Sequence, residues 1–160
     1  MLLLDSDTFL TPANSYYAFD ICDGYWNWIL RAASHGQVAS IERVKRELCV
    51  KDDQIKHWVE FHGSALFLPQ TAAVNNAMKE VSTWAASNGY TTAAVTGFLG
   101  KADAFLVAHA KCEGHEVVTL ERSAPGSKQN IKIPDACAAH DVNCITPFEM
   151  LRRHGVRFNG

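Results

Sequence analysis

The sequence predicts an α/β fold in which a central, mostly parallel sheet is covered by helices on both faces. Short apolar runs alternate with segments of helical periodicity along almost the whole chain, which is the pattern of successive β–α units. The chain has 160 residues, of which 48% are hydrophobic, and this composition suits one folded domain with one core. We therefore expect a single domain over residues 1–160 with a three-layer α/β/α architecture.

The first half of the chain opens with a short strand. The run LLLD, residues 2–5, is too short for a helix, is wholly apolar before its acid, and is followed by polar turn formers. Helices are expected where apolar residues recur every three or four positions, with acids near their first turn and glycine at their end. In chain order we predict a helix at 24–36, a strand at 37–40, helices at 41–48 and 52–63, a strand at 65–68 and a helix at 71–89.

The second half repeats this alternation. Thr91 is placed to cap a helix, Gly114 ends a very apolar one, and Pro134 stands where helices often begin. The stretch SAPGSKQN is rich in turn formers, which indicates an exposed loop. In chain order we predict helices at 91–99 and 102–114, a strand at 115–121, the loop at 123–130, a short strand at 130–133, a helix at 134–141, a strand at 143–146 and a helix at 147–155.

Composition narrows the classes of protein to consider. No apolar run approaches the roughly 20 residues that cross a bilayer, and no basic segment precedes the first apolar run, so we expect a cytoplasmic protein without a membrane partner. The net charge of −2 is not the basic footprint of most nucleic-acid binders, although a bound cation can supply positive field. The five cysteines and seven histidines form no metal-binding spacing, which favours buried, reduced thiols.

Several acids stand where a parallel sheet places its working site. Asp5 and Asp7 follow the first strand, and Glu121 ends a later one. In such sheets ligands bind beyond the carboxyl ends of the strands. Like charges so close together repel, and a buried carboxylate is costly unless it is paired, so either a bound cation or a surface turn would explain Asp5 and Asp7. Asp103 opens an apolar helix, where it either caps amide groups or points into the same cleft.

Clustered carboxylates favour hard divalent cations such as Mg²⁺ or Mn²⁺, which prefer oxygen ligands. Such a cation can lower the pKa of a bound water and can neutralise charge on a phosphate, and phosphodiester hydrolysis needs both effects. Further acids at comparable places are Glu42, Glu47 and Asp135.

The stretch ADAFLVAHAKCEGHEVVTLE resembles the second half of PIN-domain ribonucleases. In that family an Asp opens an apolar helix, a Gly ends it, and a strand then runs into a Thr followed by an acid. Asp103, Gly114, Thr119 and Glu121 occupy those places. These matches imply that Asp103 and Glu121 belong to the metal-binding set of the family.

The opening of the chain extends the resemblance. LLLDSDTFL resembles the first strand of the family, which ends in a metal-binding Asp, here Asp5. VKREL matches the pattern around the second acid of the family, which nominates Glu47, with Glu42 as a rival. Two departures are that position 7 is Asp where much of the family has Asn, and position 121 is Glu where Asp is commoner.

The resemblance runs from residue 1 to about 148, and the tail KIPDAC…CITPFEMLRRHG resembles the DUF4411 subgroup of PIN-like proteins, which is associated with toxin–antitoxin loci. It implies a PIN-like three-layer α/β/α sandwich and a metal-dependent ribonuclease that cleaves single-stranded RNA to leave a 5′-phosphate and a 3′-hydroxyl. The catalytic and metal-binding residues implied by it are Asp5, Glu47, Asp103 and Glu121, holding one or two Mg²⁺ or Mn²⁺ ions. Additional candidates are Asp7, Glu42, Thr119, Lys132 and Asp135.

Partners follow from the same resemblance. They are an RNA substrate, a cognate antitoxin protein and a second copy of the chain in a homodimer. Basic side chains could contact the RNA backbone and aromatic ones could stack on bases. The basic candidates are Arg43, Lys45, Arg46, Arg122 and Lys128, and the aromatic candidates are Tyr16, Tyr17 and Trp26.

Two other functions compete with the nuclease. DSDTF also resembles the start of haloacid-dehalogenase-type phosphatases, in which Asp5 would be the nucleophile and Asp7 the acid/base, but the acid pair that this family has after a later strand is missing behind NCIT. The chain could also be a catalytically inert PIN-like binding module. Its complete set of acids argues against that alternative.

Overall fold

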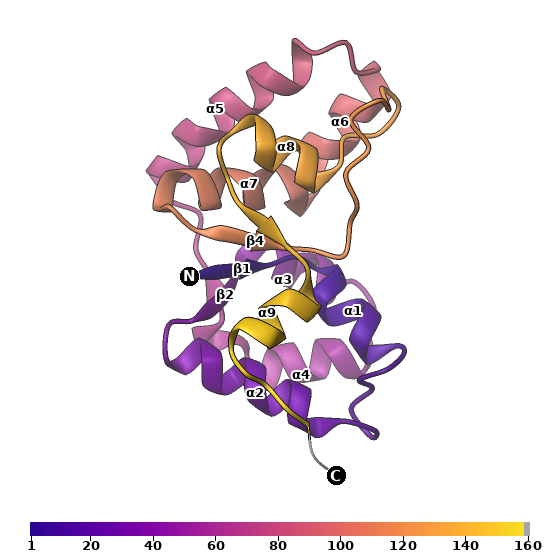
Figure 1. Ribbon diagram of the computed structural model, residues 1–160, viewed down its shortest axis with the longest axis vertical. Coiled ribbons are helices and arrows are strands. Elements are labelled where there is room, and N and C mark those ends of the chain that lie inside the picture. Colours follow the sequence, from indigo (N-terminus) through magenta and orange to yellow (C-terminus); the bar gives the residue numbers. More distant parts are fainter. Residues whose placement is uncertain (159–160) are drawn as a thin grey trace.

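A computed structural model of the chain describes residues 1–158. Its centre is a five-stranded sheet in which all paired strands run parallel, in the order β3-β2-β1-β4-β5 (Figure 1). The strands are β1 (Leu2–Leu4), β2 (Val38–Ile41), β3 (Phe67–Leu68), β4 (Glu116–Val118) and β5 (Cys144–Ile145). This all-parallel sheet, with helices on both faces, confirms the predicted α/β/α class.

The first strand lies at the centre of the sheet. Leu3 of β1 is opposite Ala39 of β2 on one side and Val117 of β4 on the other. All three leucines of β1 are buried, with at most 6% of the side chain exposed. A strand covered on both faces needs a continuous apolar run, and the sequence LLL supplies it.

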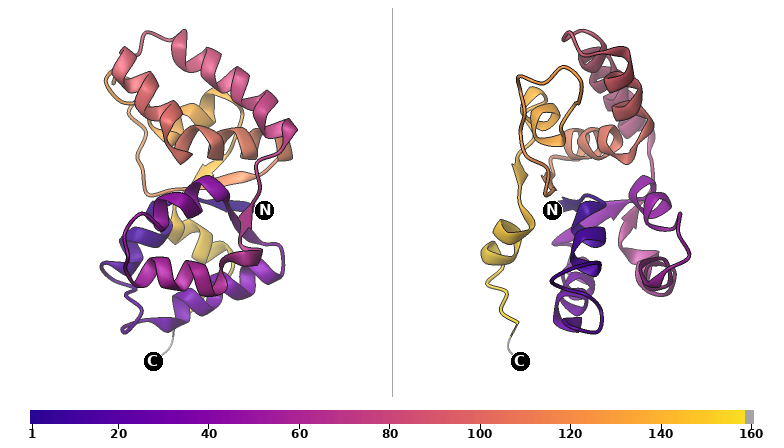
Figure 2. Two further views of the ribbon diagram at one scale, coloured as in Figure 1. Left: turned by 180° about the vertical axis from the view of Figure 1, so that it is seen from behind. Right: turned by 90° about the vertical axis from the view of Figure 1, so that its right-hand side faces the viewer.

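Helices form a layer on each side of the sheet (Figures 1 and 2). Helices α1 to α4 and α9 lie below it in Figure 1, and α5 to α8 lie above it. Their bounds are α1 (Asp7–Ala13), α2 (Asp23–Ser34), α3 (Glu42–Leu48), α4 (Gln54–His62), α5 (Ala72–Ala86), α6 (Thr92–Gly100), α7 (Ala102–Glu113), α8 (Ile133–Ala139) and α9 (Pro147–Arg153), with a 3₁₀ turn at Gly63–Ala65.

The caps expected from the sequence are present. The Thr91 hydroxyl accepts the N–H of Ala94 at 3.1 Å at the start of α6, and Gly114 ends α7 in the left-handed conformation, at φ 68°. Glycine adopts that conformation without steric cost, so it is a common helix terminator. Helix α7 packs against α5, α6 and α8, and all its residues from Ala104 to Ala110 are buried, including the predicted packing residue His109.

Helix α1 was not predicted, because the residues after LLLD were interpreted as polar turn formers, and the helix contains Pro12. In a regular helix the N–H of residue 12 would bond to the carbonyl of Thr8, but proline has no N–H. The hydroxyl of Tyr25 in α2 donates to that carbonyl at 2.7 Å instead, and both groups are buried. A contact 17 residues away therefore satisfies the helix, and no local pattern could have shown it.

The strand expected at 130–133 is absent. Ile131 and Ile133 are buried as predicted for an apolar run, but Ile133 already belongs to α8 and its N–H donates to the Glu121 carboxylate at 2.7 Å. The alternating residues Ile131 and Ile133 therefore pack a loop and the start of a helix against the core, and they do not form a strand. The strand expected at 115–121 is also shorter, because β4 ends at Val118 and Thr119 to Glu121 follow it without strand structure.

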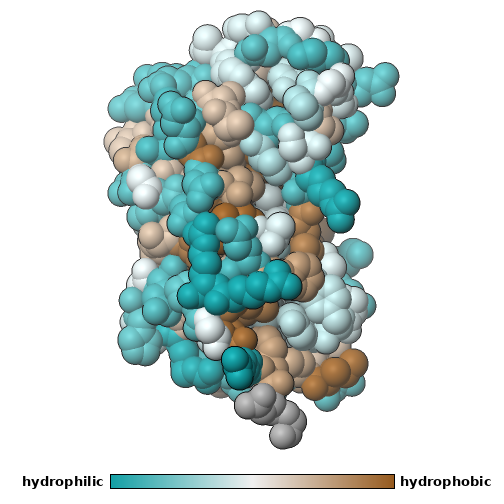
Figure 3. Space-filling view, viewed as in Figure 1, coloured by the Kyte–Doolittle hydropathy of each residue, from teal (hydrophilic) through white to brown (hydrophobic). Residues whose placement is uncertain are grey.

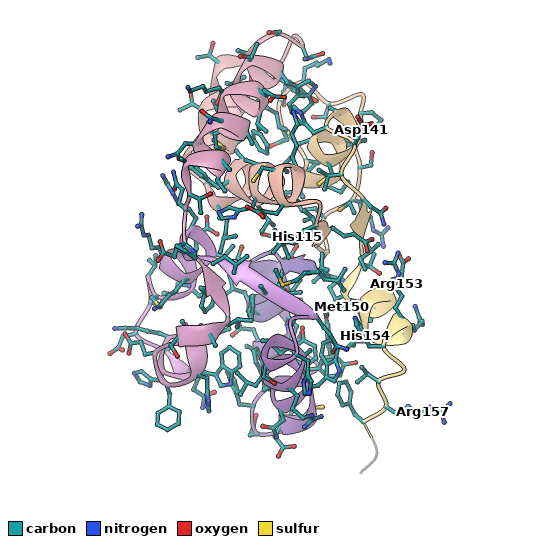
Figure 4. The ribbon with its side chains drawn as sticks, turned by 90° about the vertical axis from the view of Figure 1, so that its left-hand side faces the viewer. His115, Asp141, Met150, Arg153, His154 and Arg157 are labelled. Carbon is teal, nitrogen blue, oxygen red and sulfur yellow. The ribbon has the colours of Figure 1, made fainter. Side chains whose placement is uncertain are left out.

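The final helix lies alongside the sheet and returns toward its amino edge. Figure 4 shows Met150 and Arg153 on α9 and His154 directly after it, with Arg157 pointing outward from the tail. The Arg153 guanidinium donates to both oxygens of Glu116, the first residue of β4, at 3.0 and 3.1 Å. The His154 ring lies 5.6 Å from that of Trp28. These contacts fix α9 against the lower helix layer and β4.

The surface is mixed in character. Figure 3 shows one face that is largely hydrophilic, with hydrophobic side chains in patches across its middle. All five cysteines are free, as expected, but only Cys137 is buried, and Cys112 is exposed because it lies in the last turn of α7. Among residues 1–158 every helix is too short or too polar to cross a membrane.

Candidate metal centre

Five acids, Asp5, Asp7, Glu47, Asp103 and Glu121, form an acidic cluster near the carboxyl ends of the adjacent strands β1 and β4. Asp5 follows β1 and its N–H donates to the carbonyl of Val118 at 3.0 Å, which ties it to the end of β4. The chain leaves β1 toward β2 and α1–α2, whereas β4 lies on the other side of β1. Ligands in open α/β sheets bind where the strand order reverses in this way. The right panel of Figure 2 looks onto this edge.

Thr119 joins the first two acids. Its hydroxyl lies 2.9 Å from an oxygen of Asp5 and 3.0 Å from an oxygen of Asp7, and it accepts the N–H of Glu121 at 3.1 Å. The second oxygen of Asp5 accepts the N–H of Ser6 at 2.7 Å, and Asp7 also accepts the N–H of Leu120 at 2.9 Å. Thr119 is 1% exposed and Asp5 is 4% exposed, whereas Ser6, Asp7 and Glu121 at the border of the network are partly buried.

One carboxylate oxygen in this network has no partner. Oδ1 of Asp7 is buried and makes no hydrogen bond within the described chain. Burial raises the pKa of Asp5 well above its ordinary value, and the nearby Asp7 and Asp103 raise it further. Burial also raises the pKa of Asp7, against the opposing hydrogen bonds from Leu120 and Thr119. The pair is therefore short of positive charge.

Three more acids surround this pair. Burial raises the pKa of Asp103 to about 6, and the charges of Glu121 and Glu47 contribute to the shift, with Lys101 opposing them. Asp103 stands in the first turn of α7, but its carboxylate does not cap that helix. The cap comes from Glu47 of α3, whose Oε1 accepts the N–H of Ala102 at 2.8 Å. Asp103 is thereby left facing other carboxylates.

The acids surround the site without converging on a single point. Within residues 1–158 no three His, Cys, Asp or Glu side chains are grouped as ready metal ligands. The reason is that Glu47 and Glu121 each direct one oxygen at a helix start, Ala102 of α7 and Ile133 of α8. The other oxygen of each has no hydrogen bond among the described residues and remains available.

A pocket of about 180 Å³ opens beside the acids. Asp103 and Glu121 form part of its wall, together with Lys101 and Lys132. Lys132 therefore lies on the cleft, where the sequence placed it as an additional candidate. Lys101 was missed because its position at the α6–α7 junction becomes meaningful only once those helices are placed. A larger pocket of about 330 Å³ is lined by Glu47 but by none of the other clustered acids, and two more, of about 460 and 490 Å³, include none of them.

Comparison with known proteins gave a match to one family. Residues 2–158 match the family described as "Domain of unknown function (DUF4411)". The chain belongs to the DUF4411 family. No curated protein and no solved structure gave a significant match. The match includes all five clustered acids of this DUF4411 protein, and the description of the family assigns them no activity.

Other acids and bases named from the DUF4411 sequence lie elsewhere. Glu42 is exposed on α3 and acts on the pKa of His109, whereas Glu47 of the same helix acts on Asp103. Asp135 accepts hydrogen bonds from the Ser123 hydroxyl and, at 2.9 Å, from the N–H of Ala124, so it fastens the loop after Glu121. The structure thus separates these acids from the clustered set.

The RNA-contact candidates also divide. Arg43 stacks on the ring of Phe105 at 3.9 Å, and Lys128 donates to the carbonyl of Asn88 at 2.9 Å, so both hold the fold. Trp26 is buried and Tyr17 stacks on the Tyr25 ring, which gives both a packing role. The remaining candidates Lys45, Arg46 and Arg122 form no ion pair among the described residues.

Tyr16 remains as an aromatic candidate near the acids. It is 41% exposed, and partial burial, Tyr17 and Asp7 together raise its pKa. Its ring lies 5.9 Å from that of Phe148, the second residue of α9, which is also exposed. Phe148 was missed because its helix starts at the end of another strand, 132 positions along the chain, and only the sheet brings the two rings together.

Proposed function

We propose that this DUF4411 protein is a divalent-metal-dependent, PIN-like endoribonuclease that hydrolyses phosphodiester bonds of single-stranded RNA. One observation carries the proposal. The carboxylates of Asp5, Asp7 and Asp103 lie near the carboxyl edge of the sheet, where burial raises the pKa of each and Asp7 and Asp103 both act on the charge of Asp5. Such repulsion is costly to fold, and a divalent cation would relieve it.

The residues suit Mg²⁺ or Mn²⁺. All the donors are carboxylate oxygens, which hard cations prefer, and Oδ1 of Asp7 is buried and without a partner. Asp5, Asp103, Glu47 and Glu121 would hold the ion, with Asp7 as a further ligand. When bound, such an ion activates a water and neutralises negative charge on a phosphate.

The surrounding residues have distinct parts in the proposal. The Ser6 N–H and the Thr119 hydroxyl hold the Asp5 carboxylate in one orientation. Lys101 and Lys132 line the cleft and would balance the charge of the RNA backbone. Tyr16 and Phe148 present exposed rings on which a base can stack.

The burial of Asp5 favours a metal centre over the phosphatase alternative. A phosphatase nucleophile must expose an oxygen to the phosphorus atom. Asp5 is only 4% exposed, and both of its oxygens accept hydrogen bonds, from Ser6 and from Thr119. The steady release of phosphate from a small phosphomonoester would reverse this preference.

Two glutamates of α3 provide a matched test. Glu47→Gln keeps an oxygen for the Ala102 N–H but loses the charge beside Asp103, whereas Glu42→Gln alters an exposed acid five positions away. We expect calorimetry with Mn²⁺ to show binding to the wild type and to Glu42→Gln, and binding at least about tenfold weaker to Glu47→Gln. Labelled single-stranded RNA should be cleaved with Mn²⁺, and not with EDTA, by the same two proteins.

The outcomes separate the alternatives. Equal metal affinity in all three proteins would contradict the assignment of Glu47. Metal binding without cleavage of any single-stranded RNA would favour the inert binding module. No metal binding by the wild type would overturn the metal centre itself.

The proposal includes a biological role as the toxin of a toxin–antitoxin pair. The sequence resemblance supports it, and the exposed rings of Tyr16 and Phe148 near the acids are a surface that an inhibitory partner would have to cover. Induced expression in a bacterial host should arrest growth for the wild type and not for Glu47→Gln. Equal growth of both strains, at equal protein levels, would contradict the toxin role.

A further inference from the structure

The pocket beside the acids has a floor that the proposed hydrolysis does not use. Ala94, Gly97 and Phe98 of α6 and Ile131 of the loop before α8 form this floor. Ala94, Phe98 and Ile131 are at most 7% exposed, so their apolar surface is fixed in the core. The pocket therefore has a small apolar floor within a lining that is mostly polar and includes Asp103 and Glu121.

The size of the pocket restricts its occupant. Its volume of about 180 Å³ is below the roughly 300 Å³ typical of sites for drug-sized ligands. A single planar ring fits such a space better than a peptide or a whole nucleotide chain does. Because Asp103 and Glu121 belong to the same pocket, a ring bound there would adjoin the place where a phosphate reacts.

The rim supplies the polar groups that distinguish one ring from another. Gln129 and Asn130 line the pocket, and each amide offers both donors and acceptors. Neither side chain forms a hydrogen bond within residues 1–158 as described, so both are available to a ligand. The loop that carries them is anchored, since the Lys128 ammonium binds the carbonyl of Asn88 and the Lys128 carbonyl accepts the N–H of Thr91 at 2.9 Å.

We propose that this pocket binds the base of a nucleotide next to the scissile phosphate, and that Gln129 and Asn130 select the base. The inference rests on the proposed ribonuclease function and adds a specificity subsite to it. Proteins recognise single-stranded RNA by accepting splayed bases on apolar surfaces and bonding their edges. An anchored loop with two unpaired amides over an apolar floor provides both.

Glycines of α6 allow a test that leaves the acids intact. Gly97 lines the pocket and a Cβ there meets no heavy atom within 4 Å, so Gly97→Leu adds apolar bulk at the pocket wall and its Cβ displaces no neighbour. Gly100→Leu is the matched control, because its Cβ is equally unobstructed and Gly100 does not line the pocket. Leucine is the better helix former, so neither variant should unfold the helix.

The direct experiment uses the four ribonucleosides in EDTA, because an uncharged probe is not repelled by the acids and needs no metal. NMR titration of the wild type should shift the signals of Ala94 and Ile131 with some nucleosides more than others. Gly97→Leu should bind at least about tenfold more weakly, as expected for the loss of one base contact, and Gly100→Leu should bind as the wild type does. No shift with any nucleoside, or equal binding by all three proteins, would overturn the subsite.

A second experiment maps cleavage of a random-sequence RNA with Mn²⁺. The wild type and Gly100→Leu should cut beside a preferred base, and Gly97→Leu should cut with a flattened preference while binding Mn²⁺ normally. An unchanged preference in Gly97→Leu would refute the subsite and leave the nuclease standing. Nucleoside binding without RNA cleavage would refute the nuclease and leave the pocket as a base-binding site.

Discussion

At the scale of single residues, the Thr119 hydroxyl has one hydrogen and two carboxylates within reach. It lies about equally far from Asp5 and Asp7, at 2.9 and 3.0 Å, so it can satisfy only one of them at a time. A proton on one acid, or a cation between them, completes the arrangement. Burial raises the pKa values of both acids, so each is protonated more readily than a free carboxylate at the place where the proposal puts a cation.

The cost of this repulsion predicts that removing an acid stabilises the metal-free protein. In EDTA at pH 7, Asp103→Asn should raise the free energy of unfolding by about 1–3 kcal/mol, since the pKa of Asp103 is raised from 3.8 to about 6 and each pKa unit corresponds to about 1.4 kcal/mol before solvent screening. Asp135→Asn is the control, because Asp135 bonds a loop and its loss should destabilise. Urea denaturation measures both. A destabilised Asp103→Asn would mean that Asp103 is a structural acid.

The same shift predicts a pH dependence with a definite sign. An acid with a raised pKa stabilises the folded state below its ordinary pKa and loses that contribution as the pH rises toward the folded value. The advantage of Asp103→Asn should therefore be full above about pH 6 and fade toward pH 4. The measurement is the difference in unfolding free energy between the wild type and Asp103→Asn. Burial lowers the pKa values of His109, His115 and His140, so both proteins also lose stability as the pH falls. An advantage that is constant from pH 4.5 to 7.5 would contradict the shift.

At the scale of elements, the sequence located most helices and strands because their periodicity and caps are local. Thr91, Gly114 and Pro134 stand at the element boundaries they predicted. Helix α1 and the false strand at 130–133 could not be predicted, because their outcome depends on Tyr25 and Glu121, which are distant in sequence. Local patterns do not contain such partners.

The candidate site divides in the same way. Asp5 and Glu121 were found because acids that follow strands of a parallel sheet share one edge. The choice of Glu47 over Glu42 needed the placed helix α3, and the pocket floor needed the packing of α6 on a loop. The sequence therefore predicted the charges of the site, and the fold was required for its shape.

The Tyr25 hydroxyl gives a prediction for helix α1. Tyr25→Phe leaves the buried carbonyl of Thr8 without a donor and should lower the free energy of unfolding by about 1–3 kcal/mol. Tyr17→Phe is the control, since the Tyr17 hydroxyl makes no hydrogen bond among the described residues and the variant keeps the ring that packs on Tyr25, Tyr16 and Phe158. Adding Pro12→Ala to Tyr25→Phe restores an N–H for that carbonyl and should recover part of the loss. A neutral Tyr25→Phe would show that Thr8 has another partner.

At the scale of the whole molecule, the two ends of the strands differ in the balance of their charges. The acids gather at the carboxyl edge, whereas Arg153 is held by Glu116 at the amino end of β4. The net charge is −2, so the protein as a whole offers RNA no positive field. Positive charge at the cleft comes from Lys101 and Lys132 on the pocket wall. RNA binding should therefore depend on few ionic contacts.

This charge distribution predicts a shallow salt dependence. With two phosphates neutralised, by Lys101 and Lys132, the slope of log affinity for single-stranded RNA against log salt should be about −1.4, since each phosphate contributes about 0.7. Fluorescence anisotropy between about 50 and 300 mM KCl, with the Asp103→Asn variant so that the RNA stays intact, measures this slope. Lys101→Gln or Lys132→Gln should each reduce its magnitude by about 0.7, and Arg153→Gln, at the opposite edge, should not change it. A slope steeper than about −4 would mean that the RNA follows a broader basic surface away from this cleft.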